Sequence, residues 1–141
     1  MLTNTRLVRV QWGDCDPAGI VFYPRYFEWF DAGTILLFEK ATGLTKIRML
    51  EKYGGSGIAL IEASAKFQVP SQYGDDIEIT TAIKEFGRSS FSVEHRVTKA
   101  GVPALEGFER RVWTVRDPND PNRLRSGPIP ADVLAGFNQP A

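Results

Sequence analysis

The chain has 141 residues, and its 17 basic and 17 acidic side chains give a formal net charge of zero at neutral pH. That length suits one domain with its own core, so we expect residues 1–141 to form a single domain. The balanced charge gives no reason to expect nucleic acid as a partner. No apolar run approaches the ~20 residues that a membrane span needs, so we expect no membrane segment.

The cysteine count and the amino terminus bear on the cellular compartment. Cys15 is the only cysteine, so an internal disulfide is impossible, which fits a reducing compartment. Residues 1–6 are not followed by the apolar stretch of a signal peptide. We therefore expect a cytoplasmic protein.

The first predicted elements are a strand, a loop and a long helix. Residues 5–12 alternate between apolar and polar, which predicts a strand. Residues 13–19 contain two glycines, two aspartates and a proline, which predicts a loop. Proline is favoured at the first position of a helix, and from Pro24 to Ala41 apolar residues recur at steps of three and four. Apolar residues also lie on the other sides, so we expect a buried helix.

The rest of the chain is predicted to consist mainly of strands. Strands are predicted at residues 57–69, where Pro70 ends a long strand, and by alternation at residues 76–86, 90–98 and 105–116; short helices are expected at residues 46–53 and 131–137. Breaks that suit hairpin connections occur at residues 73–75, 87–88 and 100–101, and a turn-rich excursion is expected at residues 117–122.

Consecutive strands joined by short turns form an antiparallel sheet. A single hydrophobic helix needs a sheet to cover it. The predicted fold class is therefore α+β, with an antiparallel sheet wrapped around a long central helix. The exposed face of so small a sheet would stay partly apolar, so we also expect a homo-oligomer.

The segment from Trp12 to Pro24 is the part of the chain most suited to chemistry. It places two carboxylates, Asp14 and Asp16, in a glycine-rich turn directly before the helix. The first N–H groups of a helix lack internal partners, and the helix dipole is positive there. Such donors can stabilise the oxyanion formed when a carbonyl is attacked, and a nearby carboxylate can activate water or attack directly. Aspartates in this position also serve simply as caps or turn formers.

The run Gly-Asp-Cys-Asp-Pro-Ala-Gly-Ile-Val-Phe-Tyr-Pro at residues 13–24 resembles the active-site signature of the 4-hydroxybenzoyl-CoA thioesterases. These are acyl-CoA thioesterases with the hotdog fold. Residues 25–32 and 84–91 resemble the same family, and the similarity covers nearly the whole chain. The resemblance implies the hotdog fold and hydrolysis of an acyl-CoA thioester.

The resemblance also implies roles for individual residues. Asp16 matches the catalytic carboxylate, the backbone N–H of Tyr23 matches the group that polarises the thioester carbonyl, and Gly19 shapes the same loop. The CoA-binding segment maps onto Arg88, Ser89 and Ser90. This chain departs from the family there, because it has Gly87 and Ser89 where aroyl-CoA enzymes carry more positive charge. Active sites in the family lie between the subunits of dimers or dimers of dimers, so a homotetramer is expected.

Asp31 leaves two interpretations open. The helical pattern places it on one face with Phe27, Thr34 and Phe38, and a charge on a buried face is costly unless it is satisfied. Asp31 is then either a paired structural residue or a substrate-binding residue. In the second case it would bind a polar acyl substituent such as an aromatic hydroxyl.

Other candidates have simpler interpretations. Asp14 and Asp16 alone are too few ligands for a metal site, so we expect neither a metal nor a cofactor apart from the CoA of the substrate. Cys15 is expected to be a small core residue, and the single histidine, His95, a structural or surface residue of its strand. Four arginines could bind the phosphates of CoA: Arg110, Arg111, Arg123 and Arg125. Exposed arginines on strands are usually only solvated, so this role is an alternative.

The predicted function is hydrolysis of an aroyl-CoA such as 4-hydroxybenzoyl-CoA, with Asp16 as base or nucleophile. A short or medium aliphatic acyl-CoA is the alternative substrate. A non-catalytic acyl-CoA-binding module would need the fold but not Asp16. A hydratase of the same fold would need a different carboxylate or a histidine on the helix.

Overall fold

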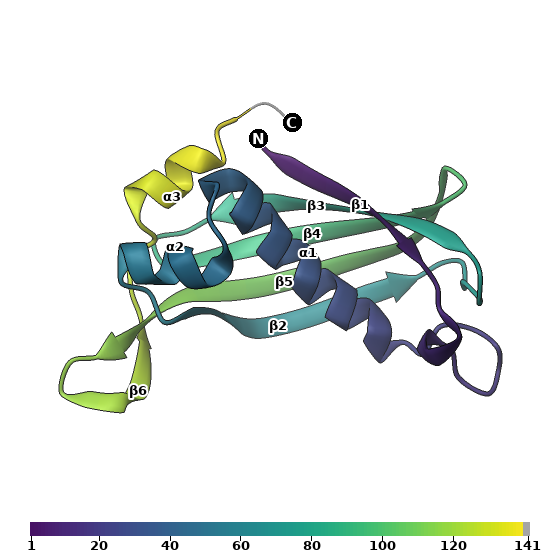
Figure 1. Cartoon of the computed structure of the whole chain (residues 1–141), viewed down its shortest axis with the longest axis horizontal. Helices are drawn as coiled ribbons and strands as arrows, with labels where there is room; N and C mark the ends of the chain where they lie inside the picture. Colours follow the sequence, from purple (N-terminus) through teal and green to yellow (C-terminus); the bar gives the residue numbers. More distant parts are fainter. Residues whose placement is uncertain (140–141) are drawn as a thin grey trace.

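The computed structural model describes residues 1–139, and it shows a curled antiparallel sheet packed against one long helix (Figure 1). In chain order the elements are β1 (Thr3–Arg9), the short 3-10 helix η1 (Trp12–Asp14), α1 (Pro24–Thr42), α2 (Lys46–Tyr53), β2 (Gly57–Phe67), β3 (Asp76–Phe86), β4 (Ser90–Lys99), β5 (Val102–Asp117), β6 (Asp120–Ser126) and α3 (Ala131–Gly136). The expected α+β architecture is confirmed. None of the described helices is long and apolar enough to cross a membrane.

Helix α1 begins and ends where its sequence predicts. Pro24 occupies the first helical turn, and Gly43 ends the helix in the left-handed conformation with its N–H bonded 2.8 Å from the Glu39 carbonyl. One face of the helix is buried against the sheet, but the opposite side, including Glu28, is exposed. The expectation of a helix buried on all sides was therefore wrong for the single chain.

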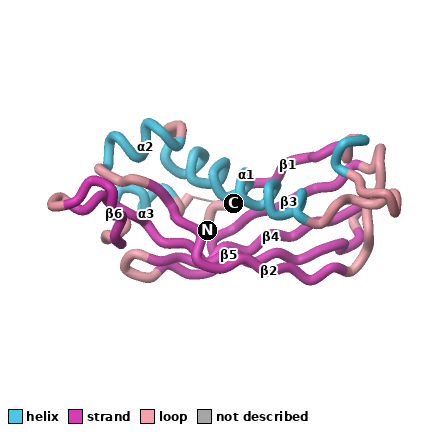
Figure 2. Tube along the Cα trace, turned by 90° about the horizontal axis from the view of Figure 1, so that it is seen from below, coloured by secondary structure: helices cyan, strands magenta, loops and turns pink. Residues whose placement is uncertain are grey.

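The strand order in the sheet is β1-β3-β4-β5-β2, with β6 pairing to β5 (Figures 1 and 2). β3, β4 and β5 are joined in sequence order by short turns, as predicted. β2 does not pair with β3; it lies at the far edge beside β5. The expected hairpin at residues 73–75 is therefore wrong, because the segment after β2 crosses the end of the sheet to reach β3. This crossing brings Gln72 beside Ile20 as an isolated bridge.

The strand β1 and the segment after β5 also differ from the sequence prediction. β1 starts two residues earlier and stops at Arg9, because the chain from Trp12 to Asp14 turns into a 3-10 helix closed by backbone bonds to Gln11 and Trp12. The predicted excursion at residues 117–122 is instead a tight turn at Asp117, followed by β6, which extends the end of β5.

The core divides into two clusters beneath α1. One surrounds the carboxyl half of the helix and includes Phe38, Phe91 and Trp113; the other surrounds its amino half and includes Tyr26 and Phe30. Helix α1 contacts β1, β3 and β4, whereas β2 stays largely open. Three large apolar side chains of β2 are more than half exposed, Leu60 at 52%, Ile61 at 59% and Phe67 at 55%.

Candidate active site

The loop between β1 and α1 forms a small hairpin that ends at the start of the helix. Cys15 and Val21 pair across it, and the Phe22 N–H bonds to the Asp14 carbonyl at 2.8 Å. At its tip the Gly19 N–H bonds to the Asp16 carbonyl at 2.9 Å. Aspartate first, proline second and glycine fourth is the pattern that such a turn favours. Gly19 has φ +83°, a left-handed conformation that glycine adopts without strain.

Asp16 is half-buried, and one of its carboxylate oxygens is fixed within this turn. Oδ1 accepts the Ala18 N–H at 2.8 Å, while Oδ2 accepts no hydrogen bond from residues 1–139. The turn therefore orients the carboxylate and leaves one oxygen free to act on a ligand. Asp14, by contrast, is tied into the loop: its Oδ2 accepts the Gln11 N–H at 2.8 Å, and its Oδ1 lies 3.8 Å from Arg25.

The start of α1 leaves one backbone donor free. Pro24 has no N–H, the Arg25 N–H bonds to the Phe22 carbonyl at 2.9 Å, and the Tyr26 N–H bonds to the Tyr23 carbonyl at 3.1 Å. The Tyr23 N–H has no hydrogen-bond partner within the described part of the chain. A free N–H at the positive end of a helix is a preorganised site for developing negative charge. The structure thus places Asp16, Gly19 and Tyr23 on one short hairpin.

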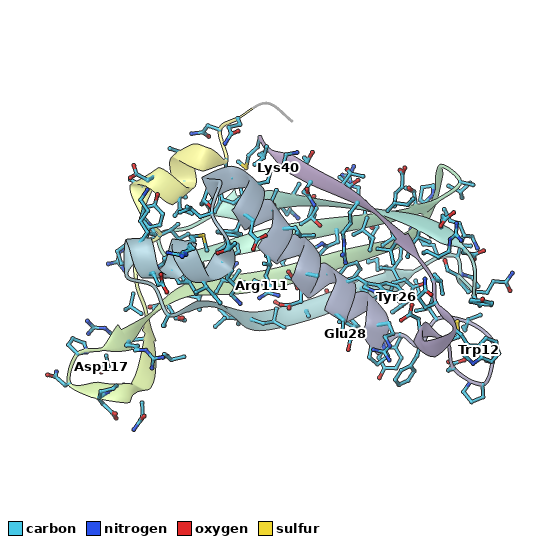
Figure 3. All side chains as sticks on the ribbon, in the orientation of Figure 1. Trp12, Tyr26, Glu28, Lys40, Arg111 and Asp117 are labelled. Carbon is cyan, nitrogen blue, oxygen red and sulfur yellow. The ribbon has the colours of Figure 1, made fainter. Side chains whose placement is uncertain are left out.

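A cavity of about 230 Å³ adjoins this hairpin. Its walls come from the loop, the first turn of α1, the end of β2 and the crossing segment, and they include Tyr23, Tyr26, Phe67 and Ser71. The rings of Tyr26 and Phe67 meet edge to face with centroids 5.9 Å apart. The lining is mostly apolar, so the cavity suits a small hydrophobic group. Figure 3 shows Tyr26 and Trp12 at this end of the molecule.

A larger hollow of about 440 Å³ lies on the other face of the sheet, away from α1. It is lined by charged side chains such as Lys66, Lys84 and Glu94. Neither Asp16 nor Tyr23 borders this hollow, so it is not part of the candidate site.

The predicted CoA-binding segment lies at the opposite end of the sheet. Arg88, Ser89 and Ser90 form the turn from β3 to β4, held by backbone bonds to Trp113 and Ile129. Strand β3 starts beside Arg9, close to the hairpin, and spans 11 residues, which is roughly 35 Å of strand. A single chain therefore does not bring this segment to Asp16.

Asp31 lies on the exposed rim of α1, where its side chain is 55% exposed. Its Oδ1 accepts a hydrogen bond of 2.7 Å from Arg111 Nη2. The expected buried position beside Thr34 and Phe38 was wrong, because Asp31 leans away from that face toward β5. The paired arrangement that the sequence left open is present, and the other carboxylate oxygen, Oδ2, accepts no hydrogen bond from residues 1–139.

Arg111 and its neighbours form a buried polar cluster under α1 that the sequence pattern did not predict. Arg111 is 4% exposed and Glu109 is 2% exposed. Burial raises the pKa of Glu109, but hydrogen bonds from His95, Arg111 and Thr34 outweigh this effect and lower it to about 2. His95 is 1% exposed, which excludes the surface position that the sequence also allowed. Arg111 is therefore unavailable to CoA phosphates, whereas Arg110 is exposed and donates to Ser90 Oγ at 3.3 Å.

The sequence did not predict two sets of positions: the cavity wall formed by Phe67 and Ser71, and the buried cluster of Glu109 and Arg111. Phe67 and Ser71 line the cavity only because β2 runs at the far edge and the crossing segment returns beneath the loop. Glu109 and Arg111 had a visible signal, since they share the inward period-two positions of β5 with Leu105 and Trp113. Within residues 1–139, no group of three or more His, Cys, Asp or Glu side chains could hold a metal ion.

Comparison with known proteins gives a consistent result. The profile described as the thioesterase-like superfamily matches residues 10–137. A 4-hydroxybenzoyl-CoA thioesterase from Pseudomonas sp. (strain CBS-3) is 38% identical over 132 residues, which cover 89% of this chain and 91% of that protein.

Solved structures show the same likeness. An Asp-to-Asn mutant of 4-hydroxybenzoyl-CoA thioesterase, complexed with 4-hydroxybenzoyl-CoA, superimposes with a TM-score of 0.86 at 33% identity, covering 96% of this chain and 99% of that one. A gentisyl-coenzyme A thioesterase has a TM-score of 0.81 at 31% identity, covering 95% of this chain and 99% of that one.

Proposed function

This chain belongs to the thioesterase-like superfamily and is an acyl-CoA thioesterase of hotdog fold, and from that premise we propose that it hydrolyses an aroyl-CoA, 4-hydroxybenzoyl-CoA foremost. The observation that carries the proposal is the hairpin at residues 13–23. It holds a carboxylate with a free oxygen and a helix-terminal N–H without a partner, next to an apolar cavity. No metal or bound cofactor is needed for this chemistry.

In the proposed mechanism Asp16 supplies the base or the nucleophile. As a base, Asp16 takes a proton from water, and the resulting hydroxide adds to the thioester carbonyl. As a nucleophile, it attacks the carbonyl, and expulsion of the CoA thiolate from the tetrahedral adduct leaves a mixed anhydride on Asp16, which water then hydrolyses. In both routes the Tyr23 N–H stabilises the oxyanion, an effect of ~3–4 kcal/mol in comparable sites. The C–S bond then breaks and CoA leaves as a thiolate, which needs little help from a general acid.

The cavity supports a flat acyl group. Its walls include the rings of Tyr23, Tyr26 and Phe67, and aromatic rings favour edge-to-face contacts with one another. A benzoyl ring placed there would lie beside the helix start with its carbonyl toward the Tyr23 N–H. The named relatives act on 4-hydroxybenzoyl-CoA and gentisyl-CoA, which both carry ring hydroxyls.

We infer that the working site is shared between two subunits. Arg88, Ser89 and Ser90 are proposed to hold the phosphates of CoA, yet they lie at the far end of the sheet from Asp16 in the same chain. A second copy of the chain resolves this separation. If two β2 strands pair antiparallel about a twofold axis, the end of one sheet that carries Arg88 lies beside the hairpin at residues 13–23 of the other chain.

β2 has the properties of such an interface. Among residues 1–139 it has a strand neighbour on one side only, β5. An exposed, apolar edge is a template for pairing with another chain, and a twofold interface uses the same surface on both copies. The exposed Leu60, Ile61 and Phe67 would be covered in the dimer. Two such dimers would give the expected tetramer.

A thiol-release assay tests the proposed function. We expect 4-hydroxybenzoyl-CoA to give the highest kcat/KM in a panel with benzoyl-CoA, gentisyl-CoA, and butyryl- and octanoyl-CoA. Asp16→Asn should lower turnover by ~10²–10⁴ without changing the Tm. Turnover within about threefold of the parent would remove Asp16 from the chemistry. Best activity on the aliphatic esters would correct the substrate class, and no release from any ester would indicate a binding module.

A further inference from the structure

A short segment, residues 70–75, lies between the end of β2 and the start of β3 and passes beside the hairpin at residues 13–23 (Figure 1). The Val21 N–H of the hairpin donates to the Ser71 carbonyl of this segment at 2.9 Å. Gln72, the next residue, forms a bridge to the same side of the hairpin. The segment is therefore the outer strand of a three-stranded miniature sheet whose other two strands belong to the hairpin.

This miniature sheet links the segment to the backbone of Asp16. The Asp16 N–H donates to the Ile20 carbonyl at 2.9 Å, so the strand that residues 71–72 hold is also the strand that holds Asp16. The same segment contributes Pro70 and Ser71 to the wall of the 230 Å³ cavity. The position of the segment thus sets where the carboxylate of Asp16 lies relative to the cavity.

Lys99, the last residue of β4, joins the two ends of the segment. Its ammonium group donates to the Pro70 carbonyl at 2.9 Å and to Asp75 Oδ2 at 3.2 Å. The same oxygen of Asp75 accepts the Gln72 N–H at 2.9 Å. One cation therefore binds the segment on both sides of Ser71 and Gln72, the two residues that contact the hairpin.

The ion pair between Lys99 and Asp75 is partly buried, with side chains that are 30% and 24% exposed. The hydrogen bond from the Gln72 N–H, and then the Lys99 ammonium, lower the pKa of Asp75 against the opposing effect of desolvation. Asp75 is therefore ionised at neutral pH, and its hydrogen bond to Lys99 is charge-assisted. By contrast, the pair of Lys84 and Glu94 on the outer face of the sheet has a longer separation of 3.7 Å and is more exposed.

Backbone hydrogen bonds fix the ends of this crossing to the sheet but not its middle. The Val69 N–H donates to a carbonyl of β5 at 2.9 Å, and the Val10 N–H, just after β1, donates to the Asp75 carbonyl at 2.8 Å. In the described part of the chain, no backbone hydrogen bond joins residues 70–72 to a strand of the sheet. Lys99 supplies the hydrogen bond that connects this middle part to β4.

We propose that Lys99 is a positioning residue for the hydrolysis, because it holds the crossing segment at the place where that segment fixes the backbone of Asp16 and one wall of the cavity. This inference rests on the proposed function. Lys99 itself does not line the cavity, so it acts through the segment. A displacement of about 1 Å at a reacting group can lower a rate by ~10²-fold.

The kinetic constants for 4-hydroxybenzoyl-CoA test this role. Lys99→Met keeps the apolar stem and removes the cation, so it should lower kcat by about 5- to 30-fold with a smaller change in KM. Lys99→Arg can still donate to both oxygens and should keep kcat within about threefold of the parent. Lys84→Met, which removes the exposed pair, is the matched control. Equal kcat for Lys99→Met and the parent would overturn the proposal.

A variant of the distant core separates positioning from a general loss of stability. Val133→Ala removes buried methyl groups from the core cluster around the carboxyl half of α1. It should lower the Tm at least as much as Lys99→Met does, yet leave kcat close to that of the parent. If Val133→Ala lowers kcat as much as Lys99→Met, Lys99 acts only through global stability and the proposal fails.

Amide hydrogen exchange follows the link between Lys99 and the hairpin without depending on activity. In Lys99→Met the Val21 N–H, which is bonded to the Ser71 carbonyl, should exchange at least about tenfold faster than in the parent. The Val93 N–H in the centre of β4 should keep its parent rate. An unchanged exchange rate at Val21 would show that the segment stays in place without Lys99.

A second variant tests the partner of the ion pair. Asp75→Asn keeps an oxygen for the Gln72 N–H but removes the charge that binds Lys99, so it should lower kcat in the same direction and by a smaller factor. The double variant with Lys99→Met should have the same kcat as Lys99→Met alone. Additive losses would mean that the two residues act separately, contrary to the proposal.

These outcomes differ from those that would refute the proposed function. If the parent enzyme releases no thiol from aroyl-CoA esters, or if Asp16→Asn keeps the parent turnover, the proposed function fails. If the parent is active and depends on Asp16, but Lys99→Met keeps the parent kcat, only the inference about Lys99 fails.

Discussion

The hairpin at residues 13–23 and the polar cluster under α1 differ in how their polar groups are hydrogen-bonded. In the hairpin, one oxygen of Asp16 and the N–H of Tyr23 have no partner within residues 1–139. In the cluster, His95, Glu109 and Arg111 are each bound by neighbouring side chains. Groups that must bind a reacting carbonyl have to be left open, whereas buried charges have to be satisfied because desolvation is costly.

This contrast gives each region a distinct response to mutation. Changes in the hairpin should alter turnover much more than stability, since its groups make few internal contacts. Changes in the cluster should alter stability first, because its charges are buried and paired with one another. The following variants test that division.

Arg111→Met should cause the largest loss of stability. It leaves Glu109 buried without its cation, a change that typically costs ~3–5 kcal/mol of the free energy of unfolding. Urea denaturation measures it, with Arg96→Met as the exposed control, expected to change stability by less than ~0.5 kcal/mol. If the two variants lose equal stability, the cluster is not the buried support that the structure indicates.

Glu109→Gln should change the acid dependence of stability. The pKa of Glu109 is lowered from 4.5 to about 2 in the folded chain. The ionised group therefore stabilises the native state above pH 4.5, and this contribution, roughly 3 kcal/mol, is lost as the pH falls toward 2.

The measurement is the free energy of unfolding between about pH 5 and 2.5. The parent should lose more stability across that range than Glu109→Gln does. Glu106→Gln, an exposed glutamate on the outer face of the same strand, should follow the parent. If the free energy of unfolding falls equally with pH in the parent and in Glu109→Gln, the pKa of the buried Glu109 carboxylate is not lowered in the folded chain.

Local patterns in the sequence predicted most of the elements but not all their neighbours. Pro24 and Gly43 mark the ends of α1, and the alternation in β3 and β4 gives their positions closely. The pairing of β2 with β5 was missed because period-two alternation shows which residues share a face, not which strand lies alongside. For the same reason the position of Phe67 in the cavity wall could not be predicted, because it depends on that pairing.

In the candidate site, too, local structure could be predicted from the sequence and long-range contacts could not. Asp16, Gly19 and Tyr23 could be placed together from sequence because a tight turn and a helix start are local structures. Arg88 could be named only by resemblance, and its distance from Asp16 needed the sheet. Asp31 was assigned to the buried face by helical spacing, yet its orientation is set by Arg111, which comes from a strand far along the chain.

Gly19→Ala should have the smallest effect on stability and still reduce turnover. Gly19 has φ +83°, and an added Cβ would meet no atom within 4 Å, so the substitution strains the backbone without a clash. The strain should cost roughly 1–2 kcal/mol. The turn that orients Asp16 must shift to relieve it, so we expect kcat to fall by about tenfold or more. Gly13→Ala is the matched control, because Gly13 also has open space at Cβ but no positive φ. A similar fall in kcat for both variants would mean that turnover depends on general mobility of the hairpin and not on the turn that fixes Asp16.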